Sequence, residues 1–261
     1  MEKINFKKKF GQNFLTDKNL LASIVRDAGI TSEDVVIEIG AGAGALTEQL
    51  ALVCKKLISF EIDTELEELL NSKFEKFENV NIIYEDFLNF DDNKINELSG
   101  ENFKVVANLP YYITTPILTK LFNLKYRPKT ISVMVQKEVG ERITASQKDS
   151  SYGYFSVFVQ ANADAKIVRQ VNRKMFTPAP NVDSVIVRLD LKQNVYPKEF
   201  FDFLKQAFQM KRKTLINNLS SYSISKQEMA DKLISIGFSE GVRADSLSIE
   251  ELYKIYNVLF N

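Results

Sequence analysis

The chain has 261 residues, of which 45% are hydrophobic and 26% charged, and its 34 Lys and Arg balance 34 Asp and Glu. That composition is typical of a globular protein with room for one large domain and a smaller one. It contains no histidine and a single cysteine, Cys54, which excludes Ser-His-Asp and Cys-His triads, an internal disulfide and a multi-cysteine zinc site, so we expect no metal. No apolar run is long enough to span a bilayer and the N-terminus lacks the apolar stretch of a signal peptide, so we expect a cytoplasmic protein without a membrane partner.

Strand and helix signals alternate through the first two thirds of the chain. Apolar runs predict strands at residues 35–39, 57–60, 80–84, 103–107 and 131–135. Helical patterns lie between them at 46–53, at 64–74 with Thr64 as the N-cap, from about Thr115-Pro116, and from Lys137 onward. This alternation predicts an α/β domain in which helices cover a mostly parallel sheet.

The last third of the chain has a different pattern. Residues 166–171 and 184–189 read as two strands around a proline-rich turn, which can form an antiparallel hairpin at the sheet edge. After about Val195 the pattern is helical, at 200–210, 212–219, 226–236 and 249–259. We therefore predict a domain at 1–194 and a small helical domain at 195–261.

A glycine-rich loop follows the first predicted strand. It reads Glu38-Ile-Gly40-Ala-Gly42-Ala-Gly44-Ala, and Gly40 and Gly42 allow a tight turn that approaches a nucleotide ligand closely. Glu61 ends the second strand, where an acid can bind ribose hydroxyls. The loop also satisfies the dinucleotide pattern GxGxxA, so these residues alone leave NAD and S-adenosyl-L-methionine both open.

The next two strand ends favour one reaction. Asp86 follows the third strand, where an acid can bind an adenine amine, and Asn108-Leu109-Pro110-Tyr111 follows the fourth. The amine of adenine is a poor nucleophile because its lone pair is delocalised into the ring. The Asn108 side-chain oxygen and a backbone carbonyl at Leu109 or Pro110 can accept both amine hydrogens and localise that lone pair, while Tyr111 stacks on the base. As a set these strand ends favour S-adenosylmethionine and adenine methylation, although Asn and Pro are also ordinary turn residues.

At this point the sequence resembles the KsgA (RsmA) family of ribosomal RNA adenine dimethyltransferases, from about Phe10 to Leu259. The segments that carry the resemblance are residues 10–15, 38–44, 108–116, 176–184, 212–215 and 243–248. The resemblance implies a Rossmann-like seven-stranded methyltransferase sheet with a C-terminal helical RNA-binding domain. It also implies dimethylation of two adjacent adenines near the 3′ end of small-subunit (16S) rRNA, within a pre-ribosomal 30S particle.

The resemblance also implies the residues of the site. Asn13 and Leu15 belong to a segment that folds over the cofactor, and Phe176 packs on the far face of the target base from Tyr111. The alternative for Phe176 is core packing. The residues expected to line the cofactor site are Gly40, Gly42, Glu61, Asp86 and Asn108.

Two other functions remain open from the sequence. Erm-type resistance methyltransferases share the fold and a similar motif but modify large-subunit rRNA; Thr115-Pro116 and residues 243–248 favour the KsgA family. The second is a non-catalytic RNA-binding factor in ribosome assembly, which the complete Asn-Leu-Pro-Tyr set and the cofactor acids disfavour.

The zero net charge hides an uneven distribution. Acids greatly outnumber bases between Thr31 and Phe103. Basic clusters lie outside that block, at residues 7–9, at Lys166, Arg169, Arg173 and Lys174, and at residues 211–213. They indicate a surface that binds a polyanion, although any one cluster can be a solvated face.

Overall fold

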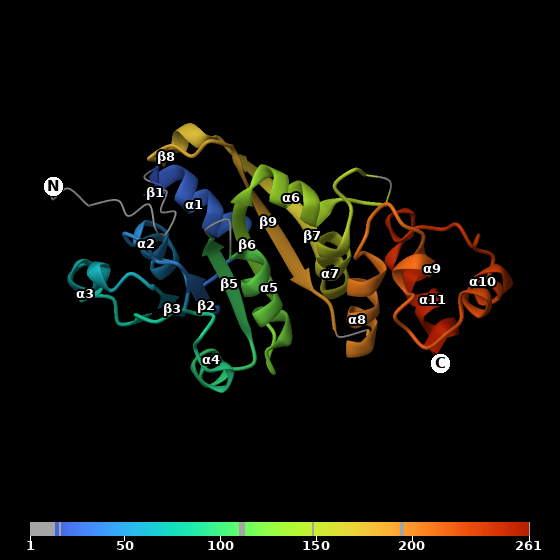
Figure 1. Ribbon diagram of the computed structural model, residues 1–261. Helices are drawn as coiled ribbons and strands as arrows, with labels where there is room; N and C mark the ends of the chain where they lie inside the picture. The colour runs from blue at the N-terminus through green and yellow to red at the C-terminus, as the bar shows by residue number, and fades with distance from the viewer. Residues whose placement is uncertain (1–13, 16, 110–112, 148, 194–195, 261) are drawn as a thin grey trace. The chain divides into compact units, whose positions relative to one another are not determined.

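The computed structural model describes residues 14–15, 17–109, 113–147, 149–193 and 196–260 (Figure 1). The chain forms two compact units, one of Met1–Gly140 with Ala165–Leu191 and the other of Glu141–Asp164 with Lys192–Asn261. The second unit thus includes residues 141–164 besides the C-terminal segment. No helix in the described ranges is long and apolar enough to cross a membrane.

The first unit is built on a seven-stranded sheet in the order β4-β3-β2-β5-β6-β9-β7. Neighbouring strands from β4 to β6 pair in parallel, and β9 pairs antiparallel with β6. The predicted Rossmann-like seven-stranded sheet is therefore confirmed. The strands are β2 (Val35–Ile39), β3 (Lys56–Phe60), β4 (Val80–Ile83), β5 (Phe103–Asn108), β6 (Thr130–Gln136), β7 (Ala163–Val171) and β9 (Ser184–Leu191).

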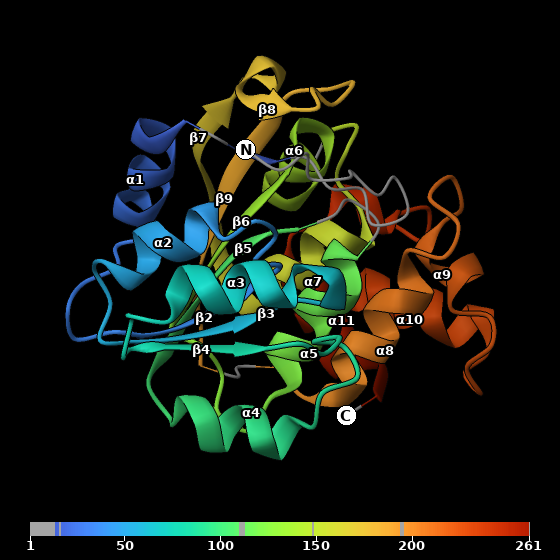
Figure 2. The same ribbon diagram turned by 90° about the vertical axis from the view of Figure 1, so that its left-hand side faces the viewer.

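Helices cover both faces of this sheet. Figure 2 shows α2 and α3 on one face and α4 on the other. Side chains of α1 and α2 form a core with sheet residues such as Val36, Leu57 and Val106, as expected for parallel strands buried on both faces. The helices are α1 (Lys18–Asp27), α2 (Ala45–Ala51), α3 (Glu67–Phe74), α4 (Asp92–Ser99), α5 (Thr114–Asn123) and α6 (Lys137–Thr144).

The connection between β7 and β9 differs from a simple hairpin. The two strands are neighbours at one edge of the sheet, as predicted. Between them the chain forms β8 (Phe176–Thr177), which pairs antiparallel with β1 (Phe14–Leu15) in a separate two-stranded sheet. This pair brings a segment from near the start of the chain against the proline-rich turn.

The predicted N-cap at Thr64 is wrong. Thr64–Leu66 forms a short 3₁₀ turn, η2, ahead of α3. Its N-cap is Asp63, which has an extended backbone, and the Asp63 carboxylate accepts a hydrogen bond from the Glu65 N–H at 3.3 Å. Asp63 comes one position before Thr64, and its carboxylate accepts from a free N–H group at the start of the turn. Thr64 therefore lies inside the turn.

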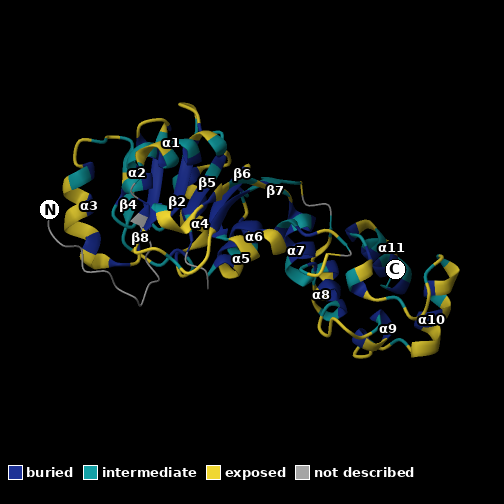
Figure 3. Cartoon of the chain, turned by 90° about the horizontal axis from the view of Figure 1, so that it is seen from above, coloured by how far each residue is buried: buried dark blue, intermediate teal, exposed yellow. Residues whose placement is uncertain are grey.

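The second unit is helical. An aromatic and aliphatic core fills it, and the buried faces of its helices turn toward one another in Figure 3. Helix α9 is one turn long and begins later than predicted, because Thr214 caps it by accepting from the Asn217 N–H at 3.4 Å. The basic residues 211–213 therefore lie in a turn before α9. The helices are α7 (Tyr154–Asn162), α8 (Lys198–Ala207), α9 (Leu215–Asn218), α10 (Lys226–Ser235) and α11 (Ile249–Phe260).

We predict that Gly44→Ala destabilises the first unit. Gly44 has φ +73°, and a Cβ there would lie 2.6 Å from Phe74 and 3.0 Å from Leu70 of α3. A matched control is Gly237→Ala, because Gly237 has φ +91° at the end of α10 and nothing within 4 Å of the added Cβ. Backbone strain should cost both variants about 1–2 kcal/mol, and overpacking should cost Gly44→Ala about 1–3 kcal/mol more. Urea unfolding of both variants measures the difference; equal losses would contradict the packing role.

Candidate active site

The register of the parallel strands brings the predicted site residues to one edge of the sheet. Ile39 is paired with Phe60 on one side and with Ala107 on the other. The next residues along the three strands are Gly40, Glu61 and Asn108. The carboxyl ends of β2, β3 and β5 therefore lie side by side, where ligands bind in open α/β sheets.

The glycine loop is held against these strand ends. The N–H groups of Gly40 and Ala41 donate to the Phe60 carbonyl at 2.8 and 3.1 Å. Gly40 and Gly42 have φ of +86° and +55°, which favours glycine. A Cβ on Gly40 would lie 3.6 Å from the Asn108 carbonyl oxygen, so the loop runs directly beside the end of β5.

Glu61 ties the loop to β3. Its side chain is 5% exposed, and its two carboxylate oxygens accept from the Gly42 N–H at 2.6 Å and the Asp63 N–H at 2.9 Å. Burial raises the pKa of Glu61, while the hydrogen bonds from backbone N–H groups act in the opposite direction. A carboxylate oxygen has two lone pairs, so Glu61 can still accept hydrogen bonds from a ligand.

A second carboxyl group, missed in the sequence interpretation, lies on β2 just before the loop. Glu38 is fully buried on β2, and the Ser59 hydroxyl donates to its Oε2 at 2.6 Å. Its Oε1 has no hydrogen-bond partner in the described part of the chain. Burial, and to a lesser degree the charge of Glu61, raise the pKa of Glu38 to about 7. The signal in the sequence that could have identified Glu38 is its place as the one acid in the otherwise apolar run 35–39.

The other described site residues are placed as follows. Asp86 holds the turn after β4, since its Oδ1 accepts from the Leu88 N–H at 2.9 Å and its Oδ2 from the Asn89 side chain at 3.0 Å. Asn108 is half-buried as the last residue of β5, and Leu109 after it is 2% exposed. Within the described ranges, no three His, Cys, Asp or Glu side chains are grouped as metal ligands.

Leu15 and Phe176 face each other across the β1–β8 pair. They are 4% and 5% exposed and belong to the core that includes Met134 and Ile186. Phe176 thus packs in a core, and its contact with a target base stays a prediction. The predicted site residues Asn13, Pro110 and Tyr111 lie outside the described residues.

Several members of the basic clusters already bind protein groups. Arg169 forms a bidentate ion pair with Asp27, at 2.5 and 3.2 Å. The Lys211 Nζ donates to the carbonyls of Ser150 and Tyr152 at 2.5 and 3.1 Å. By contrast, the exposed side chains of three basic residues have no ion-pair or hydrogen-bond partner within the described chain: Lys174, Arg212 and Lys213. Residues 7–9 lie outside the described ranges.

With this geometry established, sequence comparison decides the family. The model of a family described as "Ribosomal RNA adenine dimethylase" matches residues 3–261. The chain belongs to this family. It is 43% identical over 261 residues to "Ribosomal RNA small subunit methyltransferase A" of Caldanaerobacter subterraneus subsp. tengcongensis, covering 97% of each chain. It is 39% identical to the protein of the same name from Clostridium acetobutylicum, over all of this chain and 96% of the relative.

Solved structures agree with this assignment. A dimethyladenosine transferase from Plasmodium falciparum has a TM-score of 0.78 and 28% identity, over 93% of this chain and 95% of its own. The 23S rRNA methyltransferase ErmE has a TM-score of 0.73 at 23% identity, over 95% and 100%, and shows a shared fold. The predicted resemblance and the predicted enzyme class, an rRNA adenine methyltransferase, are therefore confirmed.

The raised pKa of Glu38 predicts a stability that falls as pH rises. Between the ordinary value of 4.5 and the folded value of about 7, the unfolded chain loses the Glu38 proton while the folded chain keeps it. The folded protein should therefore lose about 3 kcal/mol of stability across that window relative to a variant without the carboxyl. Glu38→Gln keeps an acceptor for Ser59 and should flatten the pH profile of urea unfolding. Glu68→Gln, at an exposed position on α3, is the control; parallel profiles for all three proteins would contradict the buried acid.

Proposed function

We propose that the protein uses S-adenosyl-L-methionine to dimethylate the exocyclic amines of two adjacent adenines near the 3′ end of small-subunit rRNA. The observation that carries the proposal is the position of Asn108. The residue that orients the amine lies at the end of β5, directly beside the Gly40 loop expected to hold the methyl donor. Donor loop and acceptor residue are therefore adjacent, as transfer between two bound molecules requires.

The residues at the edge of the sheet suit this cofactor. Glu61 is a buried acceptor at the position for ribose hydroxyls, and Ile62 after it is 48% exposed, so it offers an apolar surface to the adenine of the cofactor. Asp86 is placed to bind the adenine amine. When bound, S-adenosylmethionine supplies a methyl group already activated by a sulfonium, so positioning provides most of the catalysis.

The protein groups act on the target amine. The Asn108 side-chain oxygen accepts one amine hydrogen, and a backbone carbonyl at Leu109 or Pro110 accepts the other. The nitrogen lone pair then points toward the donor, and the nitrogen gains the methyl group and releases a proton to water. No strong base is needed. Tyr111 and Phe176 are proposed to clamp the base from opposite faces, Asn13 and Leu15 to close over the cofactor, and the helical segment 195–261 to bind RNA.

The names of the sequence relatives support a small-subunit substrate. We infer that it is presented in a pre-ribosomal 30S particle in the cytoplasm. The test is to incubate the protein with labelled methyl donor and either small-subunit particles lacking the modification or large-subunit rRNA. Label in two adjacent adenines of the small-subunit rRNA is expected. Label in large-subunit rRNA would indicate an Erm-type enzyme instead, and no label in either would indicate a non-catalytic factor.

Glu61→Gln should weaken binding of S-adenosylmethionine at least about tenfold, because charge-assisted hydrogen bonds contribute roughly 1.5–3 kcal/mol each. The glutamine keeps an acceptor for only one of the Gly42 and Asp63 N–H groups and places its NH₂ group against the other, so the affinity is interpreted only if the variant stays folded. Calorimetry measures the affinity, and thermal unfolding checks the fold. Unchanged affinity in a folded variant would remove Glu61 from the cofactor site.

Asn108→Ala should lower the rate of methyl transfer more than it lowers cofactor affinity. The lost acceptor matters most as the amine becomes positive, and loss of one preorganised group costs about 2.7–4 kcal/mol, or roughly 10²–10³ in rate. Single-turnover measurements with saturating cofactor isolate this step. A near wild-type rate would show that another group orients the amine.

Arg212 and Lys213 should bind RNA phosphates, whereas Lys211 already binds carbonyls of its own unit. Each phosphate contact to a flexible strand contributes about 0.7 to the log–log salt slope, so Arg212→Gln with Lys213→Gln should lower the slope by up to about 1.4. Lys198→Gln with Lys205→Gln removes two exposed charges of α8 as the control. Filter binding across salt concentrations gives the slopes; equal slopes in both double variants would mean that the turn is only solvated.

A further inference from the structure

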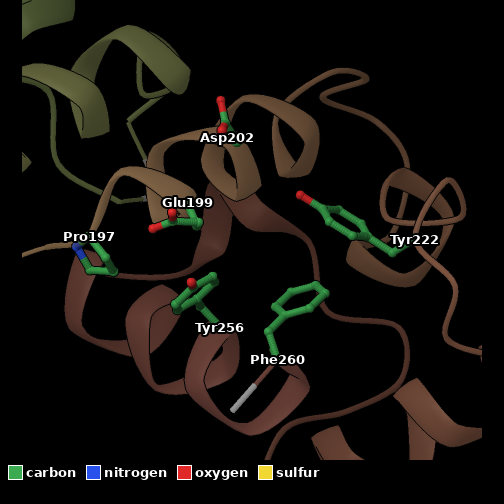
Figure 4. A pocket seen from close by; sticks show the side chains of 6 residues that line it. All are labelled: Pro197, Glu199, Asp202, Tyr222, Tyr256 and Phe260. Atoms are coloured by element: carbon green, nitrogen blue, oxygen red, sulfur yellow. The ribbon is translucent and has the colours of Figure 1, made fainter.

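The second unit contains a cavity that the methyl transfer described above does not use. Its volume is about 720 Å³, which is in the range of pockets that hold a ligand or several side-chain groups. It lies among the first two turns of α8, the last turns of α11, and the segment between α9 and α10. Figure 4 shows the residues that line it: Pro197, Glu199, Asp202, Tyr222, Tyr256 and Phe260.

One wall of the cavity is aromatic. Tyr256 and Phe260 are four residues apart on α11 and therefore share a face of that helix; their ring centroids are 5.5 Å apart. The Tyr222 ring lies 4.7 Å from that of Phe260. The three rings thus form one continuous surface, and aromatic faces attract cations.

Two carboxylates on α8 also line the cavity. Glu199 and Asp202 are three residues apart on α8, both are exposed, and neither has an ion-pair or hydrogen-bond partner anywhere in the described chain. Like charges at this spacing repel each other in a helix. They also act on the rings: after burial, the charge of Glu199 raises the pKa of Tyr256, and the charge of Asp202 raises the pKa of Tyr222. A cation in the cavity would relieve both effects.

Tyr256 adds a polar group to the aromatic side of the cavity. Its side chain is 8% exposed, and Figure 4 shows it between the side chains of Glu199 and Phe260. Its hydroxyl has no hydrogen-bond partner in the described part of the chain. The hydroxyl is therefore free to exchange a hydrogen bond with water for one with a ligand in the cavity.

We propose that this cavity binds an arginine side chain of a basic protein segment. A guanidinium is planar, so it stacks on aromatic rings, and it donates several hydrogen bonds to carboxylates in a fixed geometry. The ammonium of a polyamine cannot stack in this way. Two unpaired carboxylates repel phosphate, so the RNA backbone is a poor occupant. This site does not depend on the proposed methyl transfer, and either can fail without the other.

The test is calorimetry on the full chain with an end-blocked peptide, Gly-Arg-Gly-Arg-Gly. Its control has citrulline in place of arginine, which keeps the shape and removes the charge. We expect saturable binding of the arginine peptide only. Glu199→Gln with Asp202→Asn should weaken that binding about tenfold or more, as loss of charge-assisted hydrogen bonds implies, and Tyr256→Phe should weaken it about tenfold by removing one hydrogen bond from the charged guanidinium.

A matched pair of acids on α10 provides the control variant. Glu228 and Asp231 are also exposed and three residues apart, and their partners on α10 are Lys232 at 3.5 Å and the Gln227 side chain at 3.0 Å. Glu228→Gln with Asp231→Asn therefore changes the net charge equally without touching the cavity. This variant should bind the arginine peptide as the wild type does. Equal weakening in both double variants, or equal binding of the citrulline peptide, would overturn the site. Competition by spermidine at equal concentration would make it a polyamine site, and competition by a short single-stranded RNA would make it a base-stacking pocket; both overturn the arginine assignment.

Discussion

The hydrogen bond from the Gly42 N–H to the buried Glu61 carboxylate, at 2.6 Å, fixes the edge of the sheet on which the site is built. It joins the loop after β2 to the end of β3, and the parallel register then sets Asn108 beside the same loop. The loop in turn ends at Gly44, where α2 begins and where α3 packs too closely to admit a Cβ. The position of two helices and of the candidate amine-binding residue therefore follows from one constrained turn.

The two buried acids near this turn have opposite environments. Glu61 accepts hydrogen bonds from backbone N–H groups, which stabilise its charged form, whereas Glu38 accepts one from Ser59 and its Oε1 has no partner among the described residues. Because two neighbouring carboxylates cannot both ionise cheaply in a buried site, the charge belongs on Glu61 and the proton on Glu38. The neutral Glu38 then leaves Glu61 as the charged acceptor facing the proposed cofactor.

The sheet was predictable because each of its parallel strands is a short apolar run between turn signals. Details that depend on a single side chain were not: Asp63 replaced Thr64 as the cap, and Thr214 shortened the helix expected at 212–219. The β1–β8 pair has two residues in each strand and joins distant parts of the chain, so no periodicity could reveal it. For the same reason the sequence could not show that Leu15 and Phe176 belong to one core.

The zero net charge of this member of an RNA-modifying family is explained by the protein groups that individual charged side chains contact. Arg169 forms an ion pair with Asp27, and Lys211 donates hydrogen bonds to backbone carbonyls. The number of basic residues therefore overstates the positive charge that is available to bind phosphates. Counting acids is equally misleading, since burial raises the pKa of Glu38 to about 7 and so reduces its charge, while Glu199 and Asp202 are exposed and have no partner among the described residues. Affinity for a polyanion depends on where unpaired charges lie, and a single acidic patch beside aromatic rings can select a cationic partner on a protein whose substrate is RNA.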